Sequence, residues 1–84
     1  MEVIFELIDV NDKPIDMNKI LIYLQTRYAP SEISKEEEYY YFSSVLYDLK
    51  MWIENNRLFV MTKLDEKTIK QIFLSLNLIV VNKN

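Results

Sequence analysis

The side chains of this chain that could do acid–base or nucleophilic chemistry are those of Asp, Glu, Lys, Tyr and Ser, because its 84 residues include no histidine and no cysteine. Without histidine there is no imidazole to move protons or to activate a serine nucleophile. Without either residue type, the ordinary zinc and iron–sulfur sites cannot form. The chain also lacks glycine, which excludes phosphate-binding loops and the nucleophile elbow in their usual form.

The remaining candidate groups are not spaced for a common site. Many acidic residues lie at the predicted starts of helices, as Glu36, Glu37 and Glu38 do, where the helix dipole favours negative charge. A site for a hard cation would instead need carboxylates at a defined loop spacing. We therefore predict no catalytic residues, no metal site, no cofactor and no enzymatic activity.

The net charge of −3 is unevenly distributed. Residues 1–42 carry four Lys or Arg against nine Asp or Glu, which gives −5, whereas residues 43–84 carry six against four, which gives +2. Nucleic-acid binding needs a basic footprint, and Arg27 and Arg57 are the only arginines available to read bases. The charge distribution therefore disfavours nucleic acid as a partner.

The hydropathy pattern predicts a protein without a membrane segment. The longest apolar run, residues 78–81, is far too short to cross a bilayer. The segment after Met1 alternates glutamates with apolar residues, unlike a signal peptide. With no cysteine for disulfides, the cytoplasm is the expected location.

The amino-acid composition also indicates the base composition of the gene. Ile, Leu, Lys, Asn and Tyr are abundant, glycine is absent and Ala29 is the only alanine. Glycine and alanine have GC-rich codons, so this bias indicates an AT-rich gene. Phages, mobile elements, low-GC bacteria and archaeal viruses all fit this bias.

Residue spacing predicts the elements of the first third of the chain. Residues 2–10 alternate between apolar and acidic side chains and read as a strand. Asp16 is expected to cap a helix that ends before Pro30, since the residue before proline disfavours the α region. The apolar face of this helix is Met17, Ile20, Leu21, Leu24 and Tyr28.

A second helix is predicted over residues 34–54. Ser34 and Glu37 have the spacing of a capping box. Asn55-Asn56 is expected to end the helix, because asparagine is the next-best residue after glycine in the left-handed conformation. The core stripe of this helix, which includes the only tryptophan, is Phe42, Val45, Leu46, Leu49, Trp52 and Ile53.

The last third is predicted to be a strand, a helix and a strand. Residues 58–62 and 78–81 read as strands, and Asp65 caps a helix that ends at Asn77. Short links between these elements predict a right-handed parallel crossover. The predicted fold is thus a single α+β domain over residues 1–84. It is a two-layer sandwich in the order β-α-α-β-α-β, with three helices on a small three-stranded mixed sheet.

Two surfaces are candidates for contact with a partner. On the predicted helix over residues 34–54, Tyr40, Ser44, Tyr47 and Met51 fall opposite the core stripe, and Tyr and Met are enriched at protein interfaces. On the first strand, Ile4 and Ile8 share a sheet face that the helices are too few to cover. We predict that these six residues contact a protein partner or a second copy of the chain.

The functional interpretation is a non-enzymatic protein-binding module. If the gene comes from a phage or mobile element, an inhibitor or modulator of a host or defence protein is the expected role. One alternative is a winged-helix DNA-binding regulator, which would require residues 57–82 to form two strands joined by a turn. Another is a small structural or virion subunit. The lysines at 63, 67 and 70 form a helical stripe that reads as a solvated face rather than a phosphate site.

Overall fold

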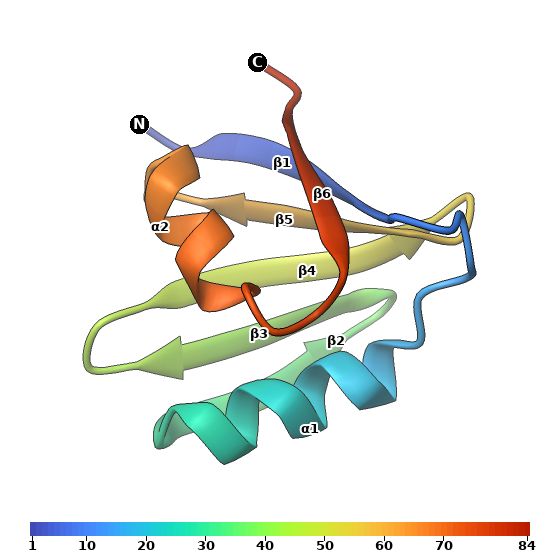
Figure 1. Cartoon of the computed structure of the whole chain (residues 1–84). Coiled ribbons are helices and arrows are strands. Elements are labelled where there is room, and N and C mark those ends of the chain that lie inside the picture. The colour runs from blue at the N-terminus through green and yellow to red at the C-terminus, as the bar shows by residue number, and fades with distance from the viewer.

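The computed structural model describes all residues from 1 to 84 and contains six strands and two helices (Figure 1). In chain order these are β1 (Val3–Asp9), α1 (Met17–Arg27), β2 (Pro30–Glu36), β3 (Tyr39–Ser44), β4 (Asp48–Glu54), β5 (Arg57–Thr62), α2 (Glu66–Ile72) and β6 (Leu78–Asn82). The strands form one sheet in the order β2-β3-β4-β5-β1-β6. Every neighbouring pair is antiparallel, and β2 and β6 are the two edges.

Both helices pack on the same face of this sheet. Their buried side chains join one apolar cluster with the inward-facing residues of β1, β3, β4 and β5. The Tyr23 hydroxyl of α1 donates a hydrogen bond of 2.7 Å to the Ile72 carbonyl of α2, which ties the helices together. In Figure 1 α1 runs alongside β2, and α2 lies beside β4 and β5. The opposite face carries no helix and is called the open face below.

The predicted helix over residues 34–54 is wrong, because these residues form the end of β2, all of β3 and β4, and the turns between them. The fold is therefore a six-stranded antiparallel sheet with two helices, not a three-stranded mixed sheet with three helices. Val45 and Leu46, predicted in the helical core, are 96% and 71% exposed between β3 and β4. Ser34 and Glu37 do not form a capping box, since Ser34 lies in β2 and Glu37 in the turn after it.

The same apolar residues fit two periodicities, which explains the error. In β4 the buried Leu49 and Met51 alternate with Lys50 and Trp52, which face the other way. Aromatic side chains also favour strands over helices, and three tyrosines in a row open β3. Trp52 was predicted in the core, but it is half-buried on the open face, and its neighbour Met51 takes the core position.

Asparagine and glutamate take the turn positions that glycine usually fills. Asn55 and Asn56 have φ values of 52° and 66° and join β4 to β5. Two consecutive residues at positive φ are the mark of a type I′ hairpin turn. The prediction that these asparagines adopt the left-handed conformation is confirmed, but they close a hairpin rather than a helix. Glu37, at φ 58°, does the same between β2 and β3.

The two remaining helices begin where the sequence predicts. Asp16 accepts a hydrogen bond of 2.9 Å from the Asn18 N–H, and Asp65 accepts one of 2.9 Å from the Thr68 N–H. Hydrogen bonding to Thr68 lowers the pKa of the Asp65 carboxyl below its usual value, because the bond favours the charged form. α2 ends at Ile72, well before the predicted Asn77.

The predicted parallel crossover between the last two strands is also wrong. β5 and β6 are not neighbours, because β1 lies between them and is antiparallel to both. α2 and the turn after it carry the chain past β1 to the far edge of the sheet. Residues 57–82 form β5, α2 and β6 rather than the two strands joined by a turn that the winged-helix alternative requires.

Candidate binding surfaces

Edge strand β6 has free backbone groups along its outer side. At its two ends, the Val10 N–H bonds the Asn77 carbonyl and the Lys83 N–H bonds the Ile4 carbonyl. Pairing groups alternate along an antiparallel strand, so residues 77, 79, 81 and 83 face β1. The N–H and C=O groups of Val80 and Asn82 therefore point away from the sheet, where no strand pairs with them.

An apolar hollow of about 320 Å³ lies beside this edge, between β6 and the end of α2. Its walls are six hydrophobic residues and one lysine, namely Lys70, Phe73, Leu74, Leu76, Leu78, Ile79 and Val80. Leu74 is 76% exposed and Ile79 is 50% exposed, although both are large aliphatic side chains. We call the outer side of β6 and this hollow together the β6 groove.

The other edge of the sheet is protected against pairing. β2 begins at Pro30, which has no N–H to donate, and its register with β3 shifts between Pro30 and Glu32. Its exposed positions include Glu32, Lys35 and Glu36. Proline, a bulge and charged side chains are the usual means by which proteins prevent pairing at an edge. β6 has none of these features, and its sequence LIVVN carries no charge.

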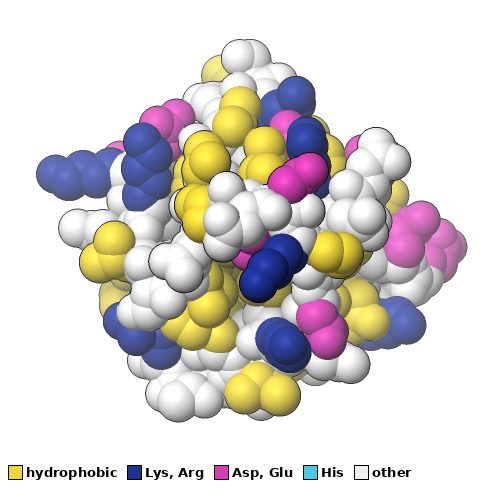
Figure 2. Space-filling model, turned by 45° about the vertical axis from the view of Figure 1, so that its right-hand side comes forward, with side chains coloured by type: hydrophobic (Ala, Val, Ile, Leu, Met, Phe, Trp, Pro, Cys, Tyr) yellow, Lys and Arg dark blue, Asp and Glu magenta, His cyan; other side chains and the backbone are white.

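Hydrophobic side chains reach solvent on the face of the molecule that Figure 2 shows. Figure 2 shows them in groups, separated by scattered lysine, arginine and acidic side chains, with no extended field of one charge. Lys70 at the rim of the β6 groove is paired with Glu66 at 3.0 Å. The lysine stripe predicted along the helix is therefore partly neutralised within the protein.

The open face carries a row of aromatic side chains across three strands. Tyr39 of β3 meets Trp52 edge to face, with ring centres 5.6 Å apart. Trp52 and Phe59 of β5 lie nearly parallel at 5.6 Å. All three rings are half-buried. Because Phe59 is paired with Glu6 of β1, the aromatic row leads directly to a carboxylate.

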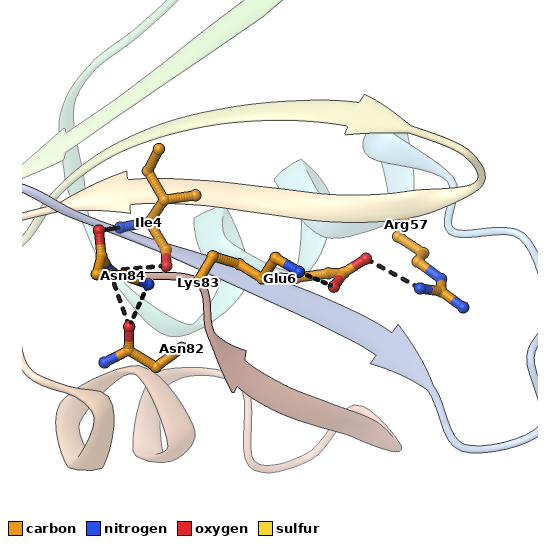
Figure 3. A network of polar contacts seen from close by, with 6 residues as sticks. All are labelled: Ile4, Glu6, Arg57, Asn82, Lys83 and Asn84. Atoms are coloured by element: carbon orange, nitrogen blue, oxygen red, sulfur yellow. Dashed lines mark hydrogen bonds and ion pairs between the residues drawn. The ribbon is translucent and has the colours of Figure 1, made fainter.

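Glu6 is a buried carboxylate held by two cations. Its Oε2 lies 3.0 Å from Arg57 Nη1 and its Oε1 lies 3.5 Å from Lys83 Nζ, and Figure 3 shows the two cations approaching from opposite sides. The hydrogen bond from Arg57 lowers the pKa of the Glu6 carboxyl, and it outweighs the opposite effect of burial. Asn84 adds hydrogen bonds to Ile4 and Asn82, which hold the last residues against β1.

The two charged residues of β4 that flank Trp52 on the open face have no ionic partner. Lys50 Nζ lies over the Tyr39 ring at 4.3 Å from its centre, and no carboxylate lies within ion-pair distance of it. Glu54, two residues beyond Trp52 on the same strand, forms no ion pair either. A hollow of about 460 Å³ lies among Ile4, Tyr39, Lys50, Trp52, Glu54, Phe59, Met61 and Lys83.

The six residues predicted to contact a partner do not form one surface. Tyr40 packs against the core and Met51 is fully buried, so the predicted helical stripe does not exist. Ser44 and Tyr47 close the turn between β3 and β4 through a 2.8 Å backbone hydrogen bond. The strand residues Ile4 and Ile8 are on the open face, where each is half-buried.

Sequence reasoning missed both the β6 groove and the aromatic row. The signal for the first was the uncharged run at residues 78–81, read only as a short final strand. The signal for the second was the alternation of Lys50, Trp52 and Glu54, which a helical interpretation spreads around the chain axis.

No protein-family model, curated protein or solved structure matches this chain. Neither helix has the length and apolarity required to cross a membrane. The fold brings no three acidic side chains together at a distance that would hold a metal ion. The β6 groove and the aromatic row of the open face are the two candidate binding surfaces of the protein.

Proposed function

We propose that this protein is a non-enzymatic binding module that captures an extended segment of another protein by strand addition along β6. The observation that carries the proposal is the free, uncharged edge of β6 beside an apolar hollow. An added strand gains main-chain hydrogen bonds from the edge, and pockets beside it select alternate side chains. Both requirements meet at the β6 groove.

The geometry defines the ligand that would fit. A segment paired with β6 bonds the outward N–H and C=O groups of Val80 and Asn82. Side chains on its helix-facing side enter the hollow beside Leu74, and those in between lie next to Ile79 on the open face. We expect an extended segment of four to six residues with aliphatic or aromatic side chains at alternate positions, in accord with typical strand lengths. The residue composition indicates an AT-rich gene, as phages and mobile elements have. For a protein of that origin, the bound segment would belong to a host or defence protein.

Selection from a displayed library of random peptides tests this function. The wild-type protein is expected to enrich peptides with alternating apolar residues. Val80→Pro should abolish this enrichment, because it removes an outward N–H while proline remains acceptable at an edge. Hydrogen exchange should show slower exchange of the Val80 and Asn82 amides when a selected peptide is bound. Wild type that enriches no apolar alternating peptide would contradict the proposal.

A matched pair of substitutions distinguishes specific peptide binding in the β6 groove from non-specific binding to exposed apolar side chains. Leu74→Ala removes a groove side chain that is 76% exposed, whereas Ile22→Ala removes one on α1 that is 62% exposed and does not line the hollow. Both variants should fold, because exposed aliphatic groups contribute little to stability. Leu74→Ala should weaken peptide binding about tenfold, equivalent to roughly 1.4 kcal/mol, and Ile22→Ala should leave it unchanged.

A further inference from the structure

On the open face, strand β4 has a charge pattern that is complementary to itself. Lys50, Trp52 and Glu54 alternate along the central strand β4, so all three point to the open face with the tryptophan in the middle. The two charged residues have no ionic partner within the chain. Reversing the direction of this strand exchanges the positions of the cation and the anion and leaves Trp52 in place.

We propose that two copies of this protein pack open face against open face, with β4 of one copy antiparallel to β4 of the other. A two-fold axis between the sheets and perpendicular to the strands passes over the row Tyr39, Trp52 and Phe59. It brings Lys50 of each copy opposite Glu54 of the other. Face-to-face packing of two sheets with aligned strands is a common arrangement, and a two-fold interface contains each pair of contacts twice.

The neighbouring strands fit the same axis. Ile4 is level with Lys50 through Met61, and Ile8 is level with Glu54 through Arg57, as the strand registers show. The rotation therefore places Ile4 opposite Ile8, so an aliphatic contact forms on each side of the aromatic row. It also places the Met61 side chain against the hydrocarbon part of Arg57. Apolar thus meets apolar, and Lys50 and Glu54 each meet the opposite charge.

Two positions on the axis bring like charges together: Glu36, which is paired with Tyr39 and is exposed on edge strand β2, and Glu6. The Glu6 position is already compensated within each copy. Glu6 lies in the same row as Trp52 and Phe59 and would face its own counterpart across the axis. Each Glu6 carboxylate carries two cations of its own chain, at 3.0 Å and 3.5 Å. The network around Glu6 therefore enters the interface without a net negative charge.

A second copy fits this face better than a nucleic-acid strand does. Single-stranded nucleic acid needs a positively charged groove beside its stacking aromatic residues. Here the hollow on the open face contains Glu54 as well as Lys50 and Lys83, and Lys83 is bound to Glu6. Charges of both signs beside aromatic residues instead suit a two-fold protein interface, in which each charge can lie opposite a charge of the other sign.

Charge reversal tests the proposal, with sedimentation equilibrium as the measurement and circular dichroism as the check of folding. Lys50→Glu alone and Glu54→Lys alone each place like charges opposite each other, and either should weaken self-association about tenfold or more. The double variant Lys50→Glu with Glu54→Lys restores both contacts and should associate like wild type. Val80→Pro should associate like wild type, since the β6 groove takes no part in this interface.

A mixing experiment completes the test. Equal amounts of the Lys50→Glu and Glu54→Lys variants should form a heterodimer, although each alone is mainly monomeric, because every cross-copy contact is then between opposite charges. Wild type that remains monomeric up to about 1 mM, or charge variants that all associate equally, would overturn the proposal. If wild type binds single-stranded DNA or RNA and Lys50→Glu abolishes this binding, the result would overturn the proposal in favour of a nucleic-acid site.

Discussion

Glu6 and Arg57 stand on neighbouring strands, and their Oε2 and Nη1 atoms form an ion pair of 3.0 Å on an otherwise mostly apolar and aromatic sheet face. Glu6 exposes only 10% of its side chain, whereas Arg57 exposes 40%. The carboxylate is thus the buried member of the pair. It also joins β1 to β5 through Arg57, and β1 to the end of β6 through Lys83, the residue that follows that strand.

The protein should lose part of its stability in acid through Glu6. Its pKa is lowered from 4.5 in the folded state, so the stabilisation is present above pH 4.5 and is lost as the pH falls through the lowered pKa. Glu6→Gln should reduce the free energy of unfolding by about 1 kcal/mol at pH 7, since the cations are partly solvated. Urea denaturation at pH 7 and pH 3 should show this difference shrinking in acid. Exposed Glu2 provides the control: Glu2→Gln should change neither value.

Met51 should contribute more to stability than the larger Trp52. Met51 is fully buried, so Met51→Ala should cost about 2–5 kcal/mol. Trp52 is half-buried and contacts two aromatic rings; Trp52→Ala should cost about 1–2 kcal/mol. Urea denaturation of dilute protein measures both without a contribution from self-association. A larger loss for Trp52→Ala would contradict its placement on the open face.

The hydrogen bond between the helices should have a measurable contribution of its own. Tyr23→Phe removes the hydroxyl that donates to the Ile72 carbonyl at 2.7 Å and keeps the ring that stacks on Phe73. The free energy of unfolding should fall by about 1 kcal/mol. Tyr28 makes an edge-to-face contact with Tyr47 but no hydroxyl hydrogen bond within the chain, so Tyr28→Phe should have almost no effect in the same denaturation experiment.

A glycine at position 37 should stabilise the protein. Glu37 adopts φ 58°, a conformation that costs a residue with a Cβ atom about 1–2 kcal/mol. Glycine relieves that cost but loses more conformational entropy on folding, so the net gain for Glu37→Gly should be about 0.5–1 kcal/mol. Thermal denaturation should show a higher Tm for Glu37→Gly. Glu38→Gly, at a position without positive φ, should lower it.

The parts of the fold that the sequence predicts correctly are those with a local physical cause. Asp16 and Asp65 cap helices because a carboxylate satisfies an N–H within three residues, and no distant contact is needed. Asn55 and Asn56 adopt positive φ for an equally local reason. Whether Asn55 and Asn56 close a hairpin or end a helix depends on whether residues 39–54 form strands or a helix. That choice is decided by contacts with residues far away in the sequence.

The binding surfaces could not be derived from the sequence because both depend on strand order. β6 is an edge only because β1 takes the place between β5 and β6. The aromatic row exists only because β3, β4 and β5 are adjacent in a register that aligns Tyr39, Trp52 and Phe59. Ile4 and Ile8 were placed correctly on one sheet face by simple alternation, since that rule needs no knowledge of neighbouring strands.

The contrast between the two sheet edges limits how many strands can be added to the sheet of one molecule. With β2 protected by Pro30 and its bulge, and β6 free, each molecule can accept one strand and offers no second edge to continue the series. One strand can therefore be added at β6, and no further strand is added at β2. Continuation of the sheet through β2 is disfavoured by Pro30 and the register shift of that strand.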